Sequence, residues 1–249
     1  MIDSLKMRFG LLGRNISYSF SKGHFTEKFK DPIFEGYTYE NFDIQDINQF
    51  QELIKNNPDL KGLNVTIPYK ETIIPFLNKR SKKAVAIGAV NTIQFTKKGK
   101  LKGYNTDYYG FKKSLQPLLQ PHHTKALILG TGGAAKAVAF ALKELGILYT
   151  IVSRENKQQT IRYDLLNATV FENHTIIINT TPLGTSPNTD NFPDIPYDFF
   201  TKKHIAYDLI YNPAETVFLQ KAKKQGAITK NGLEMLIFQA DKAWKIWNK

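Results

Sequence analysis

The sequence predicts an α/β fold with two domains, and three observations lead to this prediction. Segments of strand character alternate with segments of helical character, which is typical of mostly parallel sheets. A glycine-rich loop at residues 129–135 lies between an apolar segment and an amphipathic one, as in a Rossmann-like, dinucleotide-binding domain. The 249 residues, of which 42% are hydrophobic, suffice for two modest cores.

The first domain begins with strands and helices in alternation. Strands are expected at residues 7–13, 37–42 and 60–65, with helices at 22–30 and 46–56. Residues 89–95 and 101–104 are expected to pair as a hairpin around a turn that contains Gly99, and residues 107–120 to form a connecting helix. Residues 1–6 precede the first strand and are expected to be a loose extension.

A second α/β unit begins after Pro117 and Pro121, which stop the connecting helix. Its strands are expected at residues 126–129, 148–153, 175–179 and 204–209, with a helix at 132–145. A last helix is expected at residues 233–247. Its apolar residues at helical spacing are Leu233, Leu236, Ile237, Ala240, Trp244 and Trp247.

The composition disfavours several classes of protein. The formal net charge is +12, but only five of the 34 basic residues are arginine and the lysines are scattered, so nucleic-acid binding is not expected. A positive field would still attract an anionic substrate and cofactor. The chain has no cysteine, no clustered histidines and no apolar run near the roughly 20 residues of a membrane span. We therefore expect a cytoplasmic protein without a metal site.

Three polar clusters lie in the first domain, at residues 64–70, 88–92 and 104–107. Their side chains offer amides, hydroxyls, an ammonium and a carboxylate, which are the groups needed to hold a small polyhydroxylated acid and to move a proton on it. Lys70 follows the strand at 60–65, where substrates dock at the carboxyl edge of an open α/β sheet. The clusters therefore predict a substrate site in the first domain.

The glycine loop predicts a nucleotide site in the second domain. Gly130, Thr131, Gly132, Gly133 and Ala134 stand between a strand and a helix, where backbone N–H groups and the helix dipole can hold a pyrophosphate. The alternative is a glycine turn without a ligand.

The end of the next strand bears on the choice of dinucleotide. Arg154, after Ser153, suits the 2′-phosphate of NADP, whereas an NAD enzyme typically has an acidic residue there. Glu155 beside it would weaken that preference, and a solvated arginine is the alternative interpretation.

These motifs resemble those of the shikimate dehydrogenase family. The resemblance also includes the segments at residues 13–21, 207–213 and 231–240, so it covers nearly the whole chain. The resemblance implies the reversible, NADPH-dependent reduction of 3-dehydroshikimate to shikimate, in the pathway to the aromatic amino acids. It also implies a discontinuous substrate domain, at 1–106 and 231–249, and an NADP-binding domain at 107–230, with a cleft between them. The partners would be small molecules, and the enzyme a monomer or homodimer.

The resemblance assigns roles to individual residues. Lys70 would donate the proton, and Asp107 would orient it and bind a hydroxyl. Ser19 and Ser21 would bind the substrate carboxylate, Thr66 and Asn91 its hydroxyls, and Tyr211 and Gln239 its remaining polar edge. The cofactor residues would be Gly130, Thr131, Gly132, Gly133, Ala134, Ser153, Arg154, Thr180, Leu209 and Gly232.

Each assignment has a structural alternative. Asp107 and Ser21 are good N-cap types, Asn91 could be a bond-forming residue within a buried strand, and Gln239 could be an exposed helix residue. The chain also has Tyr18 and Lys22 where the family usually has histidine and proline.

Two other departures from the family pattern are Lys82, where some members have an acidic residue, and Glu234, which replaces a frequent glycine.

Two rival functions remain open from the sequence. They are an NAD-dependent quinate/shikimate dehydrogenase and a non-catalytic ligand-binding homologue.

Overall fold

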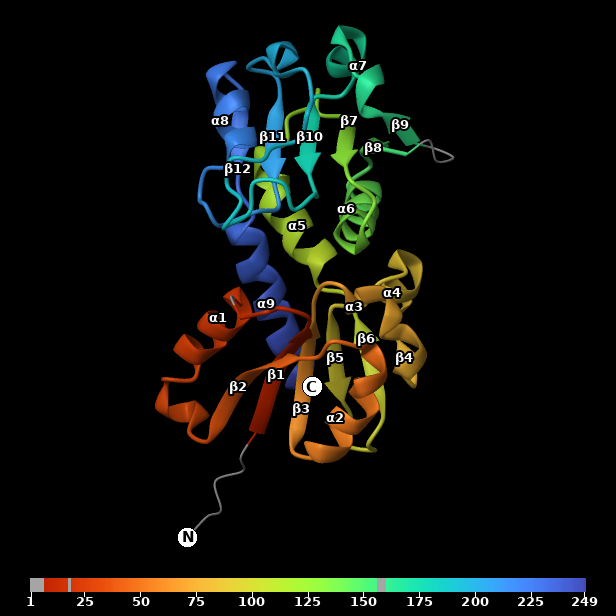
Figure 1. Cartoon of the computed structure of the whole chain (residues 1–249), viewed down its shortest axis with the longest axis vertical. Helices are drawn as coiled ribbons and strands as arrows, with labels where there is room; N and C mark the ends of the chain where they lie inside the picture. The colour runs from red at the N-terminus through yellow and green to blue at the C-terminus, as the bar shows by residue number, and fades with distance from the viewer. Residues whose placement is uncertain (1–6, 18, 156–159) are drawn as a thin grey trace. The chain divides into compact units, whose positions relative to one another are not determined.

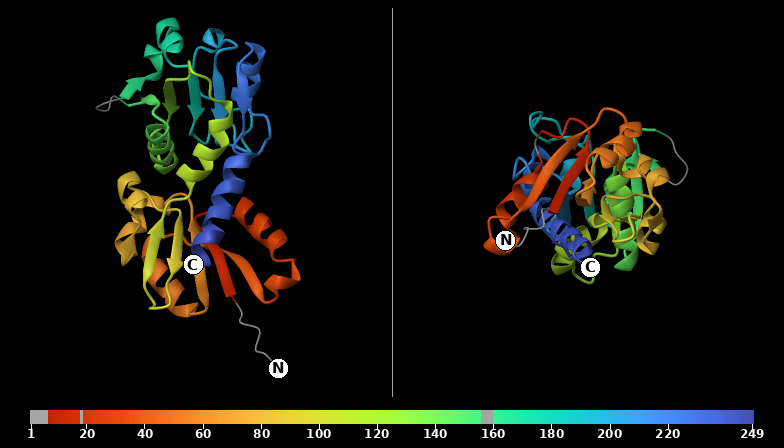
Figure 2. Two further views of the ribbon diagram at one scale, coloured as in Figure 1. Left: turned by 180° about the vertical axis from the view of Figure 1, so that it is seen from behind. Right: turned by 90° about the horizontal axis from the view of Figure 1, so that it is seen from below.

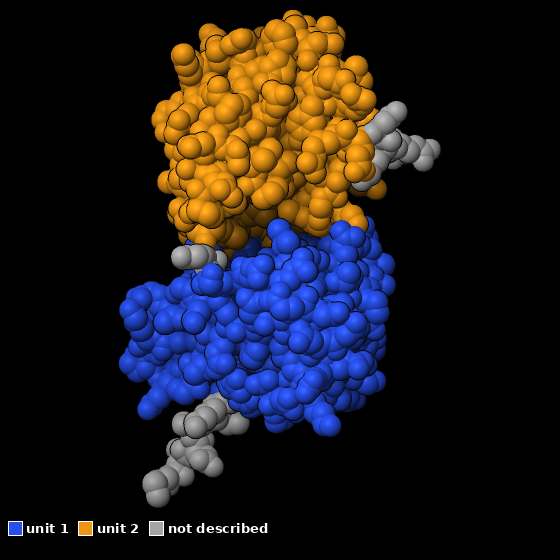
Figure 3. All heavy atoms as spheres, viewed as in Figure 1, with its two compact units in different colours: residues 1–106, 239–249 blue, residues 107–238 orange. Residues whose placement is uncertain are grey.

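The computed structural model describes residues 7–17, 19–155 and 160–249 (Figure 1), so the extension expected at 1–6 and the departure at Tyr18 lie outside the described residues. The chain divides into two compact units (Figure 3). Unit 1 comprises residues 1–106 and 239–249, and unit 2 comprises residues 107–238. The division falls at Gln239, eight residues after the predicted boundary at 231.

The sheet of unit 1 has six strands in the order β2-β1-β3-β5-β6-β4. The strands are β1 (Met7–Gly13), β2 (Tyr37–Asp43), β3 (Leu60–Val65), β4 (Lys79–Arg80), β5 (Thr92–Phe95) and β6 (Leu101–Tyr104). β5 runs antiparallel to β3 and β6, and the other pairings are parallel. The sheet is thus mostly parallel, and the expected hairpin is β5–β6, whose turn contains Gly99 at a φ of +69°.

The helices of unit 1 are α1 (Phe20–Lys28), α2 (Phe50–Asn56), α3 (Tyr69–Thr72) and α4 (Lys82–Ile87). The last helix, α9 (Leu233–Trp247), begins in unit 2 and belongs to unit 1 from Gln239 onward. The helix expected at 46–56 starts instead with the 3₁₀ turn Ile47–Gln49, because Asp46 and Gln49 form a capping box there. The helix expected at 22–30 starts earlier, since the Ser19 side chain caps it. The suggestion that Ser21 caps this helix is therefore wrong.

Both faces of this sheet carry apolar layers. Leu12, Leu63 and Val65 pack with Phe50 and Ile73 on one face. On the other, Phe9 and Tyr39 pack with Phe25 of α1 and with Ala240, Ala243 and Trp247 of α9. The Trp247 indole lies against Gly62, where a Cβ atom would overlap it, and its Nε1 donates to the Ile93 carbonyl at 3.0 Å. The C-terminal helix is therefore an integral part of the core of unit 1.

Unit 2 has a six-stranded sheet in the order β12-β11-β10-β7-β8-β9, with every pairing parallel. The strands are β7 (Lys125–Leu129), β8 (Leu148–Ser153), β9 (Thr160–Arg162), β10 (Ile176–Asn179), β11 (Ile205–Asp208) and β12 (Ile228–Lys230). The helices are α5 (Asp107–Leu115), α6 (Gly133–Glu144), α7 (Ala168–Asn173) and α8 (Val217–Lys224). This is the Rossmann-like half of the predicted fold.

Helices cover both faces of this sheet (Figure 2). Leu127, Leu129 and Ile177 face Phe171 of α7 and Phe218 of α8. On the opposite face, the Tyr207 hydroxyl lies 2.6 Å from the Ser114 hydroxyl of α5. α5 ends at Leu115, five residues before the predicted end, because Pro117 belongs to a following 3₁₀ turn, Gln116–Leu118. Within the part of the chain that the structure describes, no helix is both long and apolar enough to cross a bilayer.

Candidate active site

Lys70 and the 88–92 cluster are brought together in unit 1. Lys70 lies in the short helix α3, just beyond the carboxyl end of β3. Its carbonyl accepts a hydrogen bond from the Val90 N–H at 2.7 Å, and the Asn91 carbonyl accepts one from Val65 N–H at 2.8 Å. Thr66 donates its N–H to the Leu12 carbonyl at 2.9 Å, which fixes it between β1 and β3. Three predicted substrate residues thus share one edge of the sheet.

Asn91 is the centre of a buried network of amides and hydroxyls. Its Oδ1 accepts from the Thr106 N–H at 2.6 Å, and its Nδ2 donates to Thr106 Oγ1 at 3.0 Å and to Gln239 Oε1 at 3.4 Å. Gln239 is 4% exposed, so its interpretation as an exposed helix residue is wrong. Asn91 stands one residue before β5, so it is not a strand residue, and the strand expected at 89–95 starts only at Thr92.

Asp107 follows Thr106 directly and is the first residue of α5. It therefore lies in the first turn and not at the N-cap, where the alternative interpretation placed it. The side chain is buried, at 5% exposure, and a carboxylate at this end of a helix is stabilised by the helix dipole. The bonds from Lys70 to Val90 and from Asn91 to Thr106 place the segments of the two predicted catalytic residues on one continuous framework.

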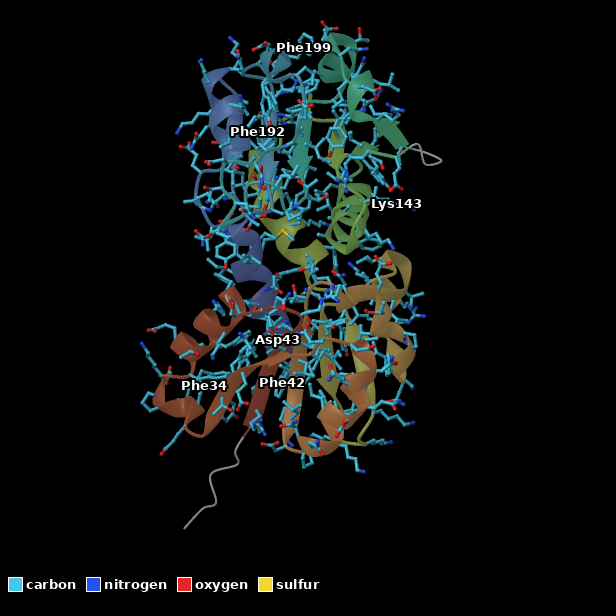
Figure 4. All side chains as sticks on the ribbon, in the orientation of Figure 1. Phe34, Phe42, Asp43, Lys143, Phe192 and Phe199 are labelled. Carbon is cyan, nitrogen blue, oxygen red and sulfur yellow. The ribbon has the colours of Figure 1, made fainter. Side chains whose placement is uncertain are left out.

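The loop before α1 carries the two predicted carboxylate-binding serines. Asp43, at the end of β2 (Figure 4), accepts from the Asn15 and Ile16 N–H groups at 3.0 and 3.2 Å. Ser19 Oγ accepts from the Lys22 N–H at 3.0 Å and so retains its own O–H for another partner. Ser21 is buried in the first turn of α1. The loop is therefore held from both ends.

Several residues of this network were not predicted as site residues from the sequence. Tyr39 donates its hydroxyl to Asn64 Oδ1 at 2.8 Å, and Asn64 Nδ2 lies 3.4 Å from Thr92 Oγ1. Thr106 also donates to Gln239 Oε1 at 3.2 Å. Asn64, Thr92 and Thr106 stand inside or beside the polar clusters, which was the available signal. Tyr39 lies in a strand with no polar motif, so the sequence offered no signal for it.

The glycine loop of unit 2 has the geometry of an open cradle. Gly130 has a φ of +112°, and a Cβ atom there would lie 2.8 Å from Thr180 Oγ1. Gly132 is the N-cap of α6, where a Cβ atom would have no neighbour within 4 Å. Thr131 and Gly132 are exposed, and Gly133 and Ala134 open the helix. Backbone N–H groups at the start of a 12-residue helix, without side chains over them, fit a pyrophosphate.

The end of β8 adjoins this loop, because the Gly130 N–H donates to the Val152 carbonyl at 3.0 Å. Ser153 is buried, and its Oγ accepts from the Glu155 N–H at 3.2 Å. Arg154 is exposed, and its charge lowers the pKa of Tyr163, which burial raises more strongly. Asn156 and Lys157, the end of the predicted 153–157 motif, lie outside the described residues.

A second set of predicted cofactor residues lies at the ends of β10 and β11. Thr180 donates both its N–H and its hydroxyl to the Leu129 carbonyl, at 3.0 and 2.7 Å. Gly232 packs so closely on Leu209 that a Cβ atom would overlap the Leu209 carbonyl. Tyr211, which was predicted to bind the substrate, also lies in unit 2, and its partial burial raises the pKa of its phenol.

Asp208 holds the segments around this second set of residues in place through hydrogen bonds. The buried carboxylate accepts from Asn179 Nδ2, the Ile210 N–H and Thr216 Oγ1, at 3.1, 3.0 and 2.6 Å. Burial raises its pKa to about 6, although these hydrogen bonds act in the opposite direction.

Known proteins are similar to this chain over nearly its whole length. A family model described as the shikimate dehydrogenase substrate binding domain matches residues 11–93. The NADP(+)-dependent shikimate dehydrogenase of Methanococcus maripaludis is 39% identical over 265 residues, covering 99% of this chain and 93% of that protein.

Two solved structures extend the comparison to the fold. The crystal structure of the shikimate dehydrogenase of Aquifex aeolicus superposes with a TM-score of 0.87 at 33% identity, covering 100% of this chain and 94% of that one. That of the Thermus thermophilus enzyme, in complex with NADP(H) and shikimate, gives a TM-score of 0.85 at 30% identity, covering 97% and 93%.

Proposed function

The chain belongs to the shikimate dehydrogenase family, and we propose how its residues carry out that family's reaction, the reversible NADPH-dependent reduction of 3-dehydroshikimate to shikimate. The observation that supports the assignment is the framework that joins the Lys70 and Asp107 segments through Val90, Asn91 and Thr106. The two ends of this framework carry an ammonium and a carboxylate, with a neutral, buried polar network between them. The reaction belongs to the pathway to the aromatic amino acids.

Lys70 acts as the proton donor. When bound, NADPH supplies the hydride for the ketone carbon of the substrate. The Lys70 ammonium gives a proton to the oxygen that becomes an alkoxide. Asp107 accepts a hydrogen bond from this ammonium and binds a substrate hydroxyl. In the reverse direction, shikimate oxidation, Lys70 takes the proton from the substrate hydroxyl.

The neutral groups bind and orient the substrate. Ser19 and Ser21 donate to its carboxylate, while Thr66, Asn91, Tyr211 and Gln239 bind its hydroxyls and remaining polar edge. Amides and hydroxyls suit this task because they give directional hydrogen bonds without burying further charge.

The cofactor is NADP, and the loop of unit 2 holds it. The Gly130 N–H is bonded to the Val152 carbonyl, so the N–H groups from Thr131 to Ala134 bind the pyrophosphate after the turn at Gly130. Arg154, whose exposed guanidinium follows Ser153 at the end of β8, binds the 2′-phosphate. Thr180 borders the nicotinamide, and Leu209 and Gly232 are further cofactor-binding residues. The open N-cap at Gly132 supports this arrangement. We also propose the domain roles predicted from the sequence. Residues 1–106 and 231–249 hold the substrate, and residues 107–230 hold NADP.

The proposal extends to the surroundings of the enzyme. It acts in the cytoplasm as a monomer or homodimer, with small molecules and not nucleic acid as partners. The scattered lysines and the scarcity of arginine support the exclusion of nucleic acid.

The test measures NADPH consumption with 3-dehydroshikimate for the wild type and for Lys70→Ala. We expect turnover with the wild type and a loss of roughly 10²- to 10⁴-fold in kcat in the variant, because the proton donor is removed. Calorimetry should give a shikimate Kd within a few-fold of the wild type.

Lys97→Ala, which changes an exposed lysine in the β5–β6 turn, is the matched control and should retain full activity. Equal activity of the Lys70 variant would remove Lys70 from the mechanism, and an inactive wild type would contradict the function itself.

A further inference from the structure

An ion pair joins the last strand of unit 2 to the first turn of α9. Lys230 ends β12, and its Nζ lies 2.6 Å from Oε2 of Glu234, four residues later in the chain. The two side chains are partly exposed, at 25% and 43%. Between them in the sequence stands Gly232, one of the proposed cofactor-binding residues. A cation and an anion therefore flank a residue that is proposed to bind the dinucleotide.

The backbone around Gly232 is held by contacts other than this ion pair. The Gly232 N–H donates to the Ile210 carbonyl at 2.9 Å, and the Gly232 carbonyl accepts from the Leu236 N–H at 3.0 Å, as the first bond of the helix. Gly232 also packs directly on Leu209, where a Cβ atom would overlap the Leu209 carbonyl. Because these contacts fix the shape of the turn, the ion pair contributes mainly its two charges.

Glu234 places a negative charge within one helical turn of Gly232. It is the second residue of α9, and the helix dipole stabilises a carboxylate at this end of a helix. Burial raises the pKa of the Tyr207 phenol in β11, and the charge of Glu234 raises it further, so this carboxylate acts on the strand that leads to Leu209. An anionic dinucleotide would be repelled by such a charge, and the Lys230 ammonium is placed to offset it.

We propose that the Lys230–Glu234 ion pair sets the affinity of unit 2 for its anionic cofactor, because Lys230 offsets a carboxylate that would otherwise repel the dinucleotide beside Gly232. This inference rests on the proposed function. It makes a prediction that a purely structural role does not make. Two variants that break the same ion pair should change cofactor affinity in opposite directions, because one leaves the negative charge without its cation and the other removes the negative charge.

The test compares Lys230→Ala with Glu234→Gln in the full-length enzyme. In fluorescence titrations at low ionic strength, we expect the Kd for NADPH to rise about threefold in Lys230→Ala and to fall about twofold in Glu234→Gln, as partly exposed charges have modest effects. The double variant has the same net charge as the wild type here, so its Kd should return to the wild-type value. The rise in Lys230→Ala should shrink at about 0.5 M salt, which screens exposed charges. At saturating substrates, kcat should stay within about twofold.

Lys112→Ala is the matched control. Lys112 pairs with Glu144 at 3.2 Å in the same unit, and Glu144 is the last residue of α6, at the opposite end of that helix from the glycine loop. This variant makes the same change in net charge and should leave the NADPH Kd unchanged. The proposal would be overturned by an equal rise in the control, by a rise in both Lys230→Ala and Glu234→Gln, or by no change in either. A wild type that binds no NADPH would contradict the proposed function instead.

Discussion

The groups proposed to bind ligands differ in physical character between the two units. The unit 1 half uses neutral side chains that are buried and already bonded to one another, such as Asn91, Thr106 and Gln239. The unit 2 half uses exposed backbone N–H groups at Gly132 and an exposed guanidinium at Arg154. A neutral hydroxyl is recognised only by direction, so its partners must be fixed, whereas a phosphate is recognised by its charge and tolerates an open loop.

The strongest test of this contrast is to break the centre of the buried network. Asn91→Ala leaves the Thr106 N–H buried without its acceptor, so we expect the free energy of unfolding to fall by roughly 1–3 kcal/mol and kcat/KM for shikimate to fall about 100-fold. Urea denaturation and steady-state kinetics measure the two effects.

Asn78→Ala is the matched control for this variant. Asn78 Oδ1 accepts from the Leu101 N–H at 2.7 Å, so its loss also leaves a backbone donor without an acceptor, but outside the proposed site. Because Asn78 is exposed and water can replace its amide, we expect a smaller loss of stability, with kcat/KM retained. Parallel losses of activity in both variants would mean that the network contributes only stability.

The second-largest effect is expected when the backbone of the glycine loop at residues 129–135 is changed. Gly130→Ala forces a side chain into a left-handed conformation and against Thr180, so we expect the KM for NADPH to rise about tenfold with the shikimate Kd unchanged. Gly146→Ala is the control, because Gly146 also has a positive φ, of +74°, but lies beyond the other end of α6 with open space around it. An equal loss of NADPH affinity in both variants would show that backbone strain alone is responsible.

A smaller effect is expected for Arg154, the charged residue among the proposed cofactor-binding groups of unit 2. Arg154→Ala should lower the ratio of NADPH to NADH efficiency by about tenfold, because one exposed charge contact with the 2′-phosphate is lost. The exposed Arg162, which pairs with Asp164 at 2.8 Å, supplies the control Arg162→Ala. The role of Arg154 would be contradicted by a cofactor ratio that stays constant.

The smallest effect on activity is expected at Asp208, where the change is in stability. The folded pKa of about 6 lies above the value of 3.8 expected when the carboxyl is exposed, so its contribution is complete below pH 4 and is lost as the pH rises through 6. Asp208→Asn should remove this dependence, and its stability relative to the wild type should therefore rise across that window. Chemical denaturation at several pH values measures the difference, and parallel curves would refute the raised pKa.

The sequence predicted the parts of the fold that repeat a local pattern. Apolar runs such as residues 126–129, and the helical spacing from Leu233 to Trp247, correspond to β7 and α9. The strands β4, β9 and β12 have only two or three residues, which is too short for alternation to be recognised, and they were not predicted. The helices α7 and α8, of six and eight residues, were not predicted either.

The candidate site was predictable where its residues stand in polar clusters and not where contacts span the sequence. Asn91 was expected as a site residue, but its partner Gln239 lies 148 residues away in the chain. Neither the link from Tyr39 to Asn64 nor that from Asp208 to Thr216 follows from spacing, because strand pairing and burial create them. Choosing Ser21 over Ser19 as the helix cap failed for a similar reason, since both residues are equally good caps by type.

The packing of Trp247 over Gly62 has a consequence for the order in which the chain folds during synthesis. Residues 239–249 follow all of unit 2 along the chain, so the aromatic layer of unit 1 stays open on the ribosome until unit 2 has been made. Unit 2 is continuous and can close its sheet first. The nascent N-terminal sheet must therefore wait with Phe9 and Phe25 uncovered, and it becomes a finished domain only when its last helix arrives.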